Sequence, residues 1–160
     1  MKQLLESFYS AFNELDAETM ASCYHPEIVF QDPAFGVLKG ERAMNMWRML
    51  CESQKGKEFK ITYSQIEAND QQGNASWEAF YVFSKTGRKV HNKIQASFEF
   101  KDGKIIKHTD DFDFNKWSSQ AFGVRGAILG RTKFFRNKLK HRVNRMLSKF
   151  EEQLQAKKLL

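Results

Sequence analysis

The sequence is short of cysteines, of paired histidines and of long apolar runs, and each shortage removes a class of protein. No apolar run approaches the length that spans a membrane. The two cysteines, Cys23 and Cys51, lie in separate apolar helical patterns, so they predict buried thiols in a reducing compartment. The four histidines include no i, i+4 pair, and we therefore expect no bound metal.

Several catalytic signatures are missing as well. The chain contains no phosphate-cradling glycine loop, no nucleophile elbow and no dinucleotide-binding fingerprint. Its first residues lack the long apolar core and the cleavage site of a secretory leader. We therefore expect a cytoplasmic protein that works without a cofactor.

Acidic residues are almost absent from the last quarter of the chain. Residues 1–114 hold 14 Lys and Arg against 17 Asp and Glu (14 − 17 = −3), whereas residues 115–160 hold 12 against 2 (12 − 2 = +10). The net charge of +7 and the pI of about 9.4 therefore arise from a C-terminal segment. They give no information about the charge of a ligand-binding pocket.

The periodicity of apolar residues changes from helical to alternating along the chain. Spacings of three and four predict helices over 2–14, 17–24 and 41–52. His25-Pro26 ends the second helix, a short strand carries Ile28, Phe30 and Asp32, and the segment 34–40 reads as a loop. Alternating polarity then predicts strands over 59–68, 75–84, 88–101 and 104–114. This order is typical of an α+β fold over residues 1–114, with a cone-shaped curved antiparallel sheet that packs on N-terminal helices and leaves a pocket.

Residues 115–160 predict a basic amphipathic helical extension. Its long helix carries an apolar stripe beside the cations, made of Phe135, Leu139, Val143, Met146, Phe150 and Leu154. Three interpretations remain open. In the first, the stripe docks on its own domain or on a second copy. In the second, the helix lies in an anionic membrane surface, with Phe134, Phe135 and Leu139 inserted and Lys and Arg at the headgroups. Nucleic acid is the least favoured partner, because the cations ring an apolar stripe without a platform of exposed aromatics.

The strand over 104–114 carries the best site candidate. Asp102-Gly103 predicts a hairpin turn in front of it. Side chains of a strand alternate, so Ile106, His108, Asp110 and Phe112 share one face. That face carries a histidine and a carboxylate among apolar residues. The other face carries Asp111 and Asp113, which we expect to meet solvent or to cap the following helix.

Two motifs, Phe30-Gln31-Asp32-Pro33 and the Asp102-Gly103-Lys104-Ile105 hairpin with its acidic, aromatic strand end, resemble the SnoaL-like or nuclear-transport-factor-like superfamily. The resemblance covers residues 2–114 and includes ketosteroid isomerase, limonene epoxide hydrolase and SnoaL-like polyketide cyclases. It implies the α+β cone, a mostly apolar pocket and a homodimer formed through the sheet. It does not imply one activity, because this fold serves isomerases, hydrolases, cyclases and non-enzymatic binders.

Matching residue by residue, Asp32 resembles the general base of ketosteroid isomerases and Asp110 resembles a catalytic carboxylate of limonene epoxide hydrolase. Two hydrogen-bond donors of the isomerase pattern fall on Phe8 and Ala96. The arginine and second aspartate of the hydrolase pattern fall on Trp77 and Ala79. The chain therefore combines a carboxylate from each pattern with His108, and neither pattern is complete.

These residues suggest acid/base chemistry by Asp32, His108 and Asp110 on an apolar or carbonyl-bearing small molecule. The structural alternatives are a turn residue before proline for Asp32 and a core histidine for His108. The side chains predicted to line the pocket are Phe8, Trp47, Tyr63, Trp77, Tyr81, Asn92, Ala96 and Phe112. The runner-up function is a non-catalytic ligand-binding or protein-interaction module of the same fold.

Overall fold

A computed structural model describes residues 1–159, so Leu160, the last residue of the predicted extension, lies outside the described part. The chain begins with five segments: α1 (Lys2–Asn13), α2 (Ala17–Cys23), β1 (Tyr24–Asp32), β2 (Gly36–Lys39) and α3 (Glu41–Gln54). Four long strands follow: β3 (Phe59–Ala68), β4 (Gln72–Phe83), β5 (Arg88–Lys101) and β6 (Lys104–Asp111). The chain ends with α4 (Phe114–Phe122), α5 (Val124–Leu129) and α6 (Lys133–Lys158).

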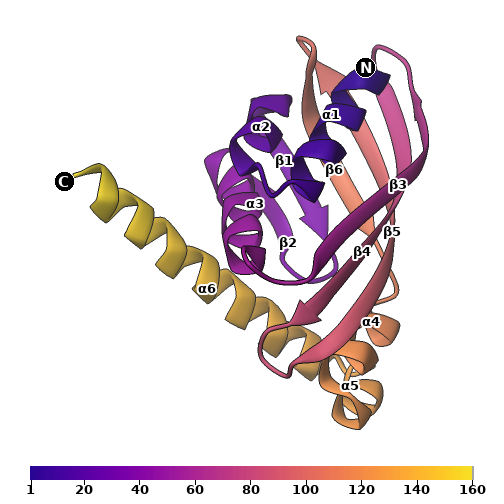
Figure 1. Ribbon diagram of the computed structural model, residues 1–160, viewed down its shortest axis with the longest axis vertical. Coiled ribbons are helices and arrows are strands. Elements are labelled where there is room, and N and C mark those ends of the chain that lie inside the picture. The colour runs from indigo at the N-terminus through magenta and orange to yellow at the C-terminus, as the bar shows by residue number, and fades with distance from the viewer. Residues whose placement is uncertain (160) are drawn as a thin grey trace.

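The six strands form one curved sheet in the order β2-β1-β6-β5-β4-β3 (Figure 1). All neighbours are antiparallel except β1 and β6, which run parallel. Helix α1 lies over the concave side of the sheet, and α3 lies beside β1 and β2. The predicted α+β cone is therefore confirmed.

The predicted helices and strands agree with the structure where local signals are strong. Helix α1 buries Leu5, Phe8, Tyr9 and Phe12 at helical spacing. The Asp16 carboxylate caps α2 by accepting from the backbone N–H of Thr19 (3.1 Å). Asp102 and Gly103 both have positive φ, of 51° and 72°, as a two-residue hairpin turn requires.

Two predictions around the first strand were wrong. Tyr24 belongs to β1 and not to the preceding helix, and Pro26 does not interrupt that strand. The pairing of β1 with β6 shifts register between Tyr24 and Val29, and a proline is tolerated at such an irregularity. Residues 36–39, predicted as part of a loop, form β2 and pair with the end of β1.

Helix α6 packs against its own domain through a stripe that differs from the predicted one by one residue. Leu147 is fully buried in the main core, whereas Met146, the predicted member, is 53% exposed. Leu139 packs in a second apolar cluster with Trp117 of α4, and Val143 contacts both clusters. The Asn144 amide donates to the Phe35 carbonyl (3.0 Å), and Arg42 pairs with Glu151. The first two thirds of α6 thus close one end of the cone.

The short α5 lies close to α4 because of a glycine. A Cβ added at Gly126 would lie 1.9 Å from the Ser118 carbonyl oxygen, so no larger residue fits there. Gly126 therefore allows α5, in which it lies, to approach α4 closely. No helix in residues 1–159 is both long enough and apolar enough to cross a membrane.

Candidate functional site

The inward face of β6 carries His108 and Asp110, as the alternation predicts. His108 has no exposed surface and Asp110 is 4% exposed, whereas Lys107 and Asp111 on the other face are exposed. The prediction that Ile106 is the first member of this face is wrong. Ladder pairing with β5 skips Ile106, and this bulge turns Ile105 into the core in its place.

Polar side chains from four elements form one line of hydrogen bonds around His108. Trp47 Nε1 donates to the Tyr24 oxygen (2.8 Å), which lies 2.7 Å from His108 Nδ1. On the other side of the ring, His108 Nε2 lies 3.0 Å from Asp110 Oδ1, and Trp77 Nε1 donates to the same oxygen (3.1 Å). We call these five residues, Trp47, Tyr24, His108, Asp110 and Trp77, the buried network.

The donors and acceptors of the buried network fix the histidine tautomer. An indole N–H can only donate, so the Tyr24 oxygen accepts from Trp47, and the Tyr24 hydroxyl proton is available to His108 Nδ1. Burial raises the pKa of Tyr24 well above its usual value, which keeps that proton in place. His108 therefore carries its proton on Nε2 and donates it to Asp110.

Aromatic rings surround the histidine. Phe98 lies 4.4 Å from its ring centroid, Phe30 5.2 Å and Phe8 5.5 Å, while Trp47 stacks nearly parallel to it at 6.0 Å. In such a dry environment an unpaired polar group would be costly, and the network pairs each nitrogen of the imidazole. His108 is thus a positioning group and not one that meets a ligand in this conformation.

Asp32 lies beside the buried network, at the end of β1. The parallel register pairs Phe30 with His108 and Gln31 with Thr109, so the end of β1 approaches Asp110, whose charge acts on Asp32. Asp32 is half-buried, and its Oδ1 accepts from the backbone N–H groups of Ala34 (2.9 Å) and Phe35 (2.6 Å). Asp32 therefore has the geometry of a turn residue, as the structural alternative predicted. Its second carboxylate oxygen makes neither of these two hydrogen bonds.

The pKa of Asp32 is raised from 3.8 to about 7. Burial is the largest cause, and the negative charge of Asp110 adds to it. The hydrogen bonds from Phe35 and Ala34 act in the opposite direction and do not offset the burial. A carboxyl group with this pKa can both accept and release a proton near neutral pH.

Tyr9 supplies an unpaired hydroxyl close to the same site. The side chain is fully buried, and its oxygen has no hydrogen-bond partner within residues 1–159. Burial and the charge of Asp110 raise the pKa of Tyr9 well above its usual value, so the hydroxyl remains a donor. Buried hydroxyls normally have a hydrogen-bond partner. The Tyr9 hydroxyl has none, and a ligand oxygen could accept its hydrogen bond.

The structure brings some of the predicted pocket residues together and separates others. Trp47 and Trp77 belong to the buried network, and Phe8 packs against His108. Ala96 lies opposite Asp110 in the β5–β6 ladder. Tyr81 lies elsewhere, accepting from Trp117 Nε1 (2.8 Å). Asn92 and Phe112 are half-buried, Asn92 opposite Ala79 on β4 and Phe112 packed against Trp117.

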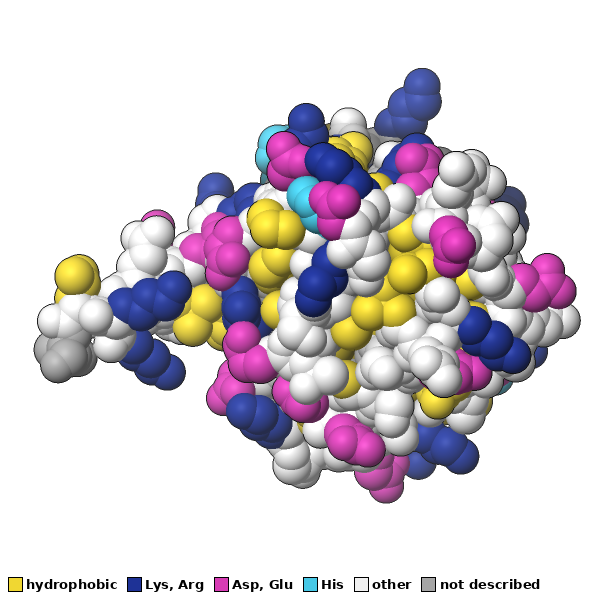
Figure 2. All heavy atoms as spheres, turned by 90° about the horizontal axis from the view of Figure 1, so that it is seen from above, with side chains coloured by type: hydrophobic (Ala, Val, Ile, Leu, Met, Phe, Trp, Pro, Cys, Tyr) yellow, Lys and Arg dark blue, Asp and Glu magenta, His cyan; other side chains and the backbone are white. Residues whose placement is uncertain are grey.

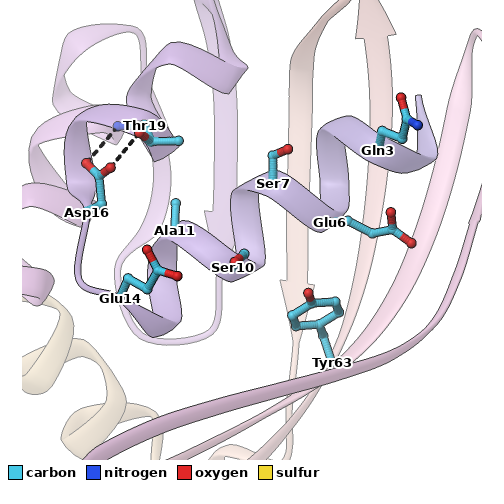
Figure 3. A pocket seen from close by; sticks show the side chains of 9 residues that line it. All are labelled: Gln3, Glu6, Ser7, Ser10, Ala11, Glu14, Asp16, Thr19 and Tyr63. Carbon is cyan, nitrogen blue, oxygen red and sulfur yellow. Dashed lines mark hydrogen bonds between the residues drawn. The ribbon is translucent and has the colours of Figure 1, made fainter.

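Two surface hollows lie away from the buried network. One, of about 650 Å³, runs along the outer side of α1 and is lined mostly by polar side chains such as Glu6, Ser10 and Glu14 (Figure 3). Tyr63, predicted to line the interior pocket, forms one wall of this hollow and is 39% exposed. The other hollow, of about 600 Å³, lies between α3 and the end of α6. Within residues 1–159, no group of three or more His, Cys, Asp and Glu side chains is placed to hold a metal ion.

Sequence reasoning missed Tyr24 and Tyr9. Tyr24 was not predicted as a site residue because it was assigned to the helix before Pro26. The alternation of Ile28, Phe30 and Asp32 nevertheless extends back to Tyr24 across the register shift in β1. Tyr9 follows Phe8, the position on which the isomerase tyrosine donor falls, and it was not predicted as a site residue. A tyrosine on the fully buried face of a helix needs a partner for its hydroxyl, and that requirement was the available signal.

Residues 5–108 match the SnoaL-like domain family, and the chain belongs to that family. An LEH-like epoxide hydrolase of M. tuberculosis has a similar fold, with a TM-score of 0.61 and 19% identity over 79% of this chain and 91% of that one. A proposed polyketide cyclase of Streptomyces antibioticus is 19% identical over 74% of this chain and 95% of that one, with a TM-score of 0.60. TerC, crystallised with polyporic acid, is 15% identical over 74% and 95%, with a TM-score of 0.62. No curated protein matches the chain.

Proposed function

We propose that the protein is a cofactor-free acid/base enzyme that acts on an apolar or carbonyl-bearing small molecule. The observation that carries this proposal is the Asp32 carboxyl, half-buried beside Asp110 with its pKa raised to about 7. A base of this pKa is half ionised at neutral pH, where proton transfer is most effective. Proton transfer of this kind serves isomerisation, dehydration, aldol-type cyclisation and addition of water.

The neighbouring residues take separate roles in the proposed reaction. Asp32 accepts the proton from the substrate or from water. Its burial, together with the charge of Asp110, keeps the pKa of Asp32 high enough for it to return the proton. His108 and Trp77 hold Asp110 in place by donating to its Oδ1. The unpaired hydroxyl of Tyr9 donates to a substrate oxygen on which negative charge develops.

The family supports a small-molecule ligand. Proteins with this fold at 15–19% identity include one named as an epoxide hydrolase and one crystallised with polyporic acid. The aromatic interior around Trp47, Trp77 and Phe98 matches an apolar ligand in chemistry. Tyr9 has no exposed surface, so the proposed reaction also requires the side chains that fill the cone to move when substrate enters.

The test incubates the purified protein with a small-molecule extract of its source cells and follows consumed and bound compounds by mass spectrometry. We expect a compound that the wild type consumes and Asp32→Asn does not. The matched control is Asp111→Asn, because Asp111 is exposed on the opposite face of β6 and should leave consumption unchanged. Tyr9→Phe should lower the rate by about 10²-fold or more.

Equal consumption by wild type and Asp32→Asn would contradict the assigned base. A compound that all variants bind and none consumes would favour the second candidate function, a non-catalytic ligand-binding module. One observation favours that candidate: the buried network satisfies both imidazole nitrogens internally, as a purely structural core would.

We also propose that the protein forms a homodimer through the outer face of the sheet. This face carries Phe80, which is 36% exposed and stacks on His91 at 4.1 Å, together with a hydrogen-bonded row of Gln65, Ser76 and Gln95. Light scattering during gel filtration should give twice the chain mass of 18.7 kDa, and Phe80→Glu should return it to that mass. A monomer at all concentrations would contradict this assembly.

A further inference from the structure

One end of the molecule exposes apolar side chains that no part of the described chain covers. Val124 and Ile128 are one turn apart on α5 and are 76% and 66% exposed, and Leu129 follows at 44%. Phe134, in the first turn of α6, is 77% exposed. These four are among nine exposed large apolar residues in residues 1–159, and the other five are scattered over the rest of that surface.

The chain holds the two helix segments that carry these side chains close together. Gly130, Arg131 and Thr132 connect α5 to α6, and Arg136 Nε donates to the Gly130 carbonyl (3.0 Å). Thr132 caps α6 by accepting from the backbone N–H of Phe135 (3.2 Å). Figure 1 shows α5 and the start of α6 together at the lower end of the molecule. We call Val124, Ile128, Leu129 and Phe134 the apolar tip.

Cations without carboxylate partners surround the apolar tip. Arg125, Arg131, Lys133 and Lys138 are exposed, and the sequence has no Asp or Glu between positions 114 and 150. Spacings of four, three, four and four residues continue from Phe134 along the outer side of α6 through Lys138, His141, Arg145 and Lys149, all exposed. Within residues 1–159, no Lys or Arg from position 115 onward lies within 4.0 Å of a carboxylate.

The opposite end of the molecule has a different surface. Figure 2 shows that Asp and Glu side chains are interspersed there among Lys and Arg. Several of those cations are paired, for example Lys101 with Glu27 (3.0 Å) and Lys107 with Glu99 (2.8 Å). The paired charges of both signs at that end contrast with the unpaired positive charge around the apolar tip.

We propose that the apolar tip and the cations around it bind the surface of an anionic phospholipid bilayer. Apolar side chains that protrude next to Lys and Arg can enter the acyl boundary while the cations reach the headgroup phosphates. A nucleic-acid surface would instead offer several aromatic rings for base stacking, and Phe134 is the only exposed aromatic side chain in the described part of α4 to α6. The apolar stripe of α6 is already covered by the protein's own domain, so this binding uses the other side of the helix.

The test measures co-sedimentation of the full chain with vesicles of phosphatidylcholine alone or mixed with phosphatidylserine. We expect binding to the anionic vesicles that weakens in high salt. The double variant Ile128→Ser/Phe134→Ser should bind at least about tenfold more weakly, because two inserted side chains are lost. Lys138→Gln/Arg145→Gln should also bind more weakly, through loss of two headgroup contacts.

Matched controls distinguish binding by this surface from binding that any exposed apolar or cationic side chain would give. Leu159→Ser removes an apolar side chain that is 88% exposed at the far end of α6, and Lys2→Gln/Lys60→Gln removes two exposed cations from α1 and β3. Both should bind as the wild type does, and the thermal unfolding midpoint of every variant should match it. Absence of wild-type binding to anionic vesicles, or equal binding by Ile128→Ser/Phe134→Ser, would overturn the proposal. Tight binding to duplex DNA without binding to vesicles would also overturn it.

Discussion

Residues 1–114 and residues 115–159 differ in how far their Lys and Arg side chains are paired with carboxylates. In the first region seven of fourteen Lys and Arg side chains pair with carboxylates, and the interior carries a histidine and a carboxylate in the buried network. In the second, none of twelve is paired within the described chain, and the cations face solvent beside exposed apolar groups. This difference supports the two proposals, acid/base chemistry in the first region and an external partner for the second, although α6 is anchored in the core of the first.

The largest expected effect tests that anchoring. Leu147→Ala should lower the free energy of unfolding by about 2–5 kcal/mol, because Leu147 is fully buried where α6 enters the main core. The control is Met146→Ala at the neighbouring, half-exposed position, which should change it by less than about 0.5 kcal/mol. Chemical denaturation measures both. Equal losses in the two variants would show that α6 does not pack in the main core and that the two regions are structurally independent.

The next effect concerns the buried network in the first region. Tyr24→Phe removes the hydroxyl between Trp47 and His108 and leaves an N–H donor and a ring nitrogen unpaired in an aromatic core. We expect a loss of about 1–3 kcal/mol in the free energy of unfolding. Tyr63→Phe is the matched control, because that tyrosine is exposed at the surface hollow along α1. A neutral Tyr24→Phe would mean that the network does not stabilise the fold.

A smaller and pH-dependent effect is expected at Asp32. Its folded-state pKa of about 7 lies above the unfolded value of about 3.9, so ionisation costs stability as the pH rises from about 4 to 7. Asp32→Asn should therefore stabilise the protein by roughly 1–2 kcal/mol at pH 8, less than the full shift implies because the residue is half-buried. At pH 4 the two proteins should be nearly equal. A stabilisation that does not vary with pH would contradict the raised pKa.

The smallest effect tests the ion pair that joins the two regions. Glu151→Gln removes the partner of Arg42, and both side chains are partly exposed. The expected loss is at most about 1 kcal/mol and should shrink in high salt. Glu152→Gln, at the exposed neighbouring position, should have no effect. A larger loss would mean that charge, in addition to the apolar stripe, determines how α6 docks.

Much of the fold could be predicted because its signals are local. The hairpin at Asp102-Gly103 and the four long strands follow from turn residues and alternating polarity. The inward placement of His108 and Asp110 follows from the same alternation. The cap at Asp113 was also expected, and its carboxylate accepts from the backbone N–H groups of Asn115 and Lys116.

The remaining errors arise where long-range pairing overrides a local pattern. The bulge at Ile106 depends on the length of the facing segment of β5, and β2 exists only because β1 lies next to it. The choice of Leu147 over Met146 depends on which side of α6 meets α3 and β2, and both residues fit a helical stripe. The partnership of Tyr24 with His108 joins residues 84 positions apart, which no local spacing predicts.

The central claim is that Asp32 ionises near neutral pH because it is buried beside Asp110. The most direct test is a ¹³C NMR titration of the aspartate carboxyl carbons in wild type, with Asp32→Asn identifying the resonance. We predict a carboxyl group with a pKa of about 7, and a lower pKa for the same group in Asp110→Asn, where the neighbouring charge is gone. A pKa near 4 for Asp32 in the wild type would contradict the account.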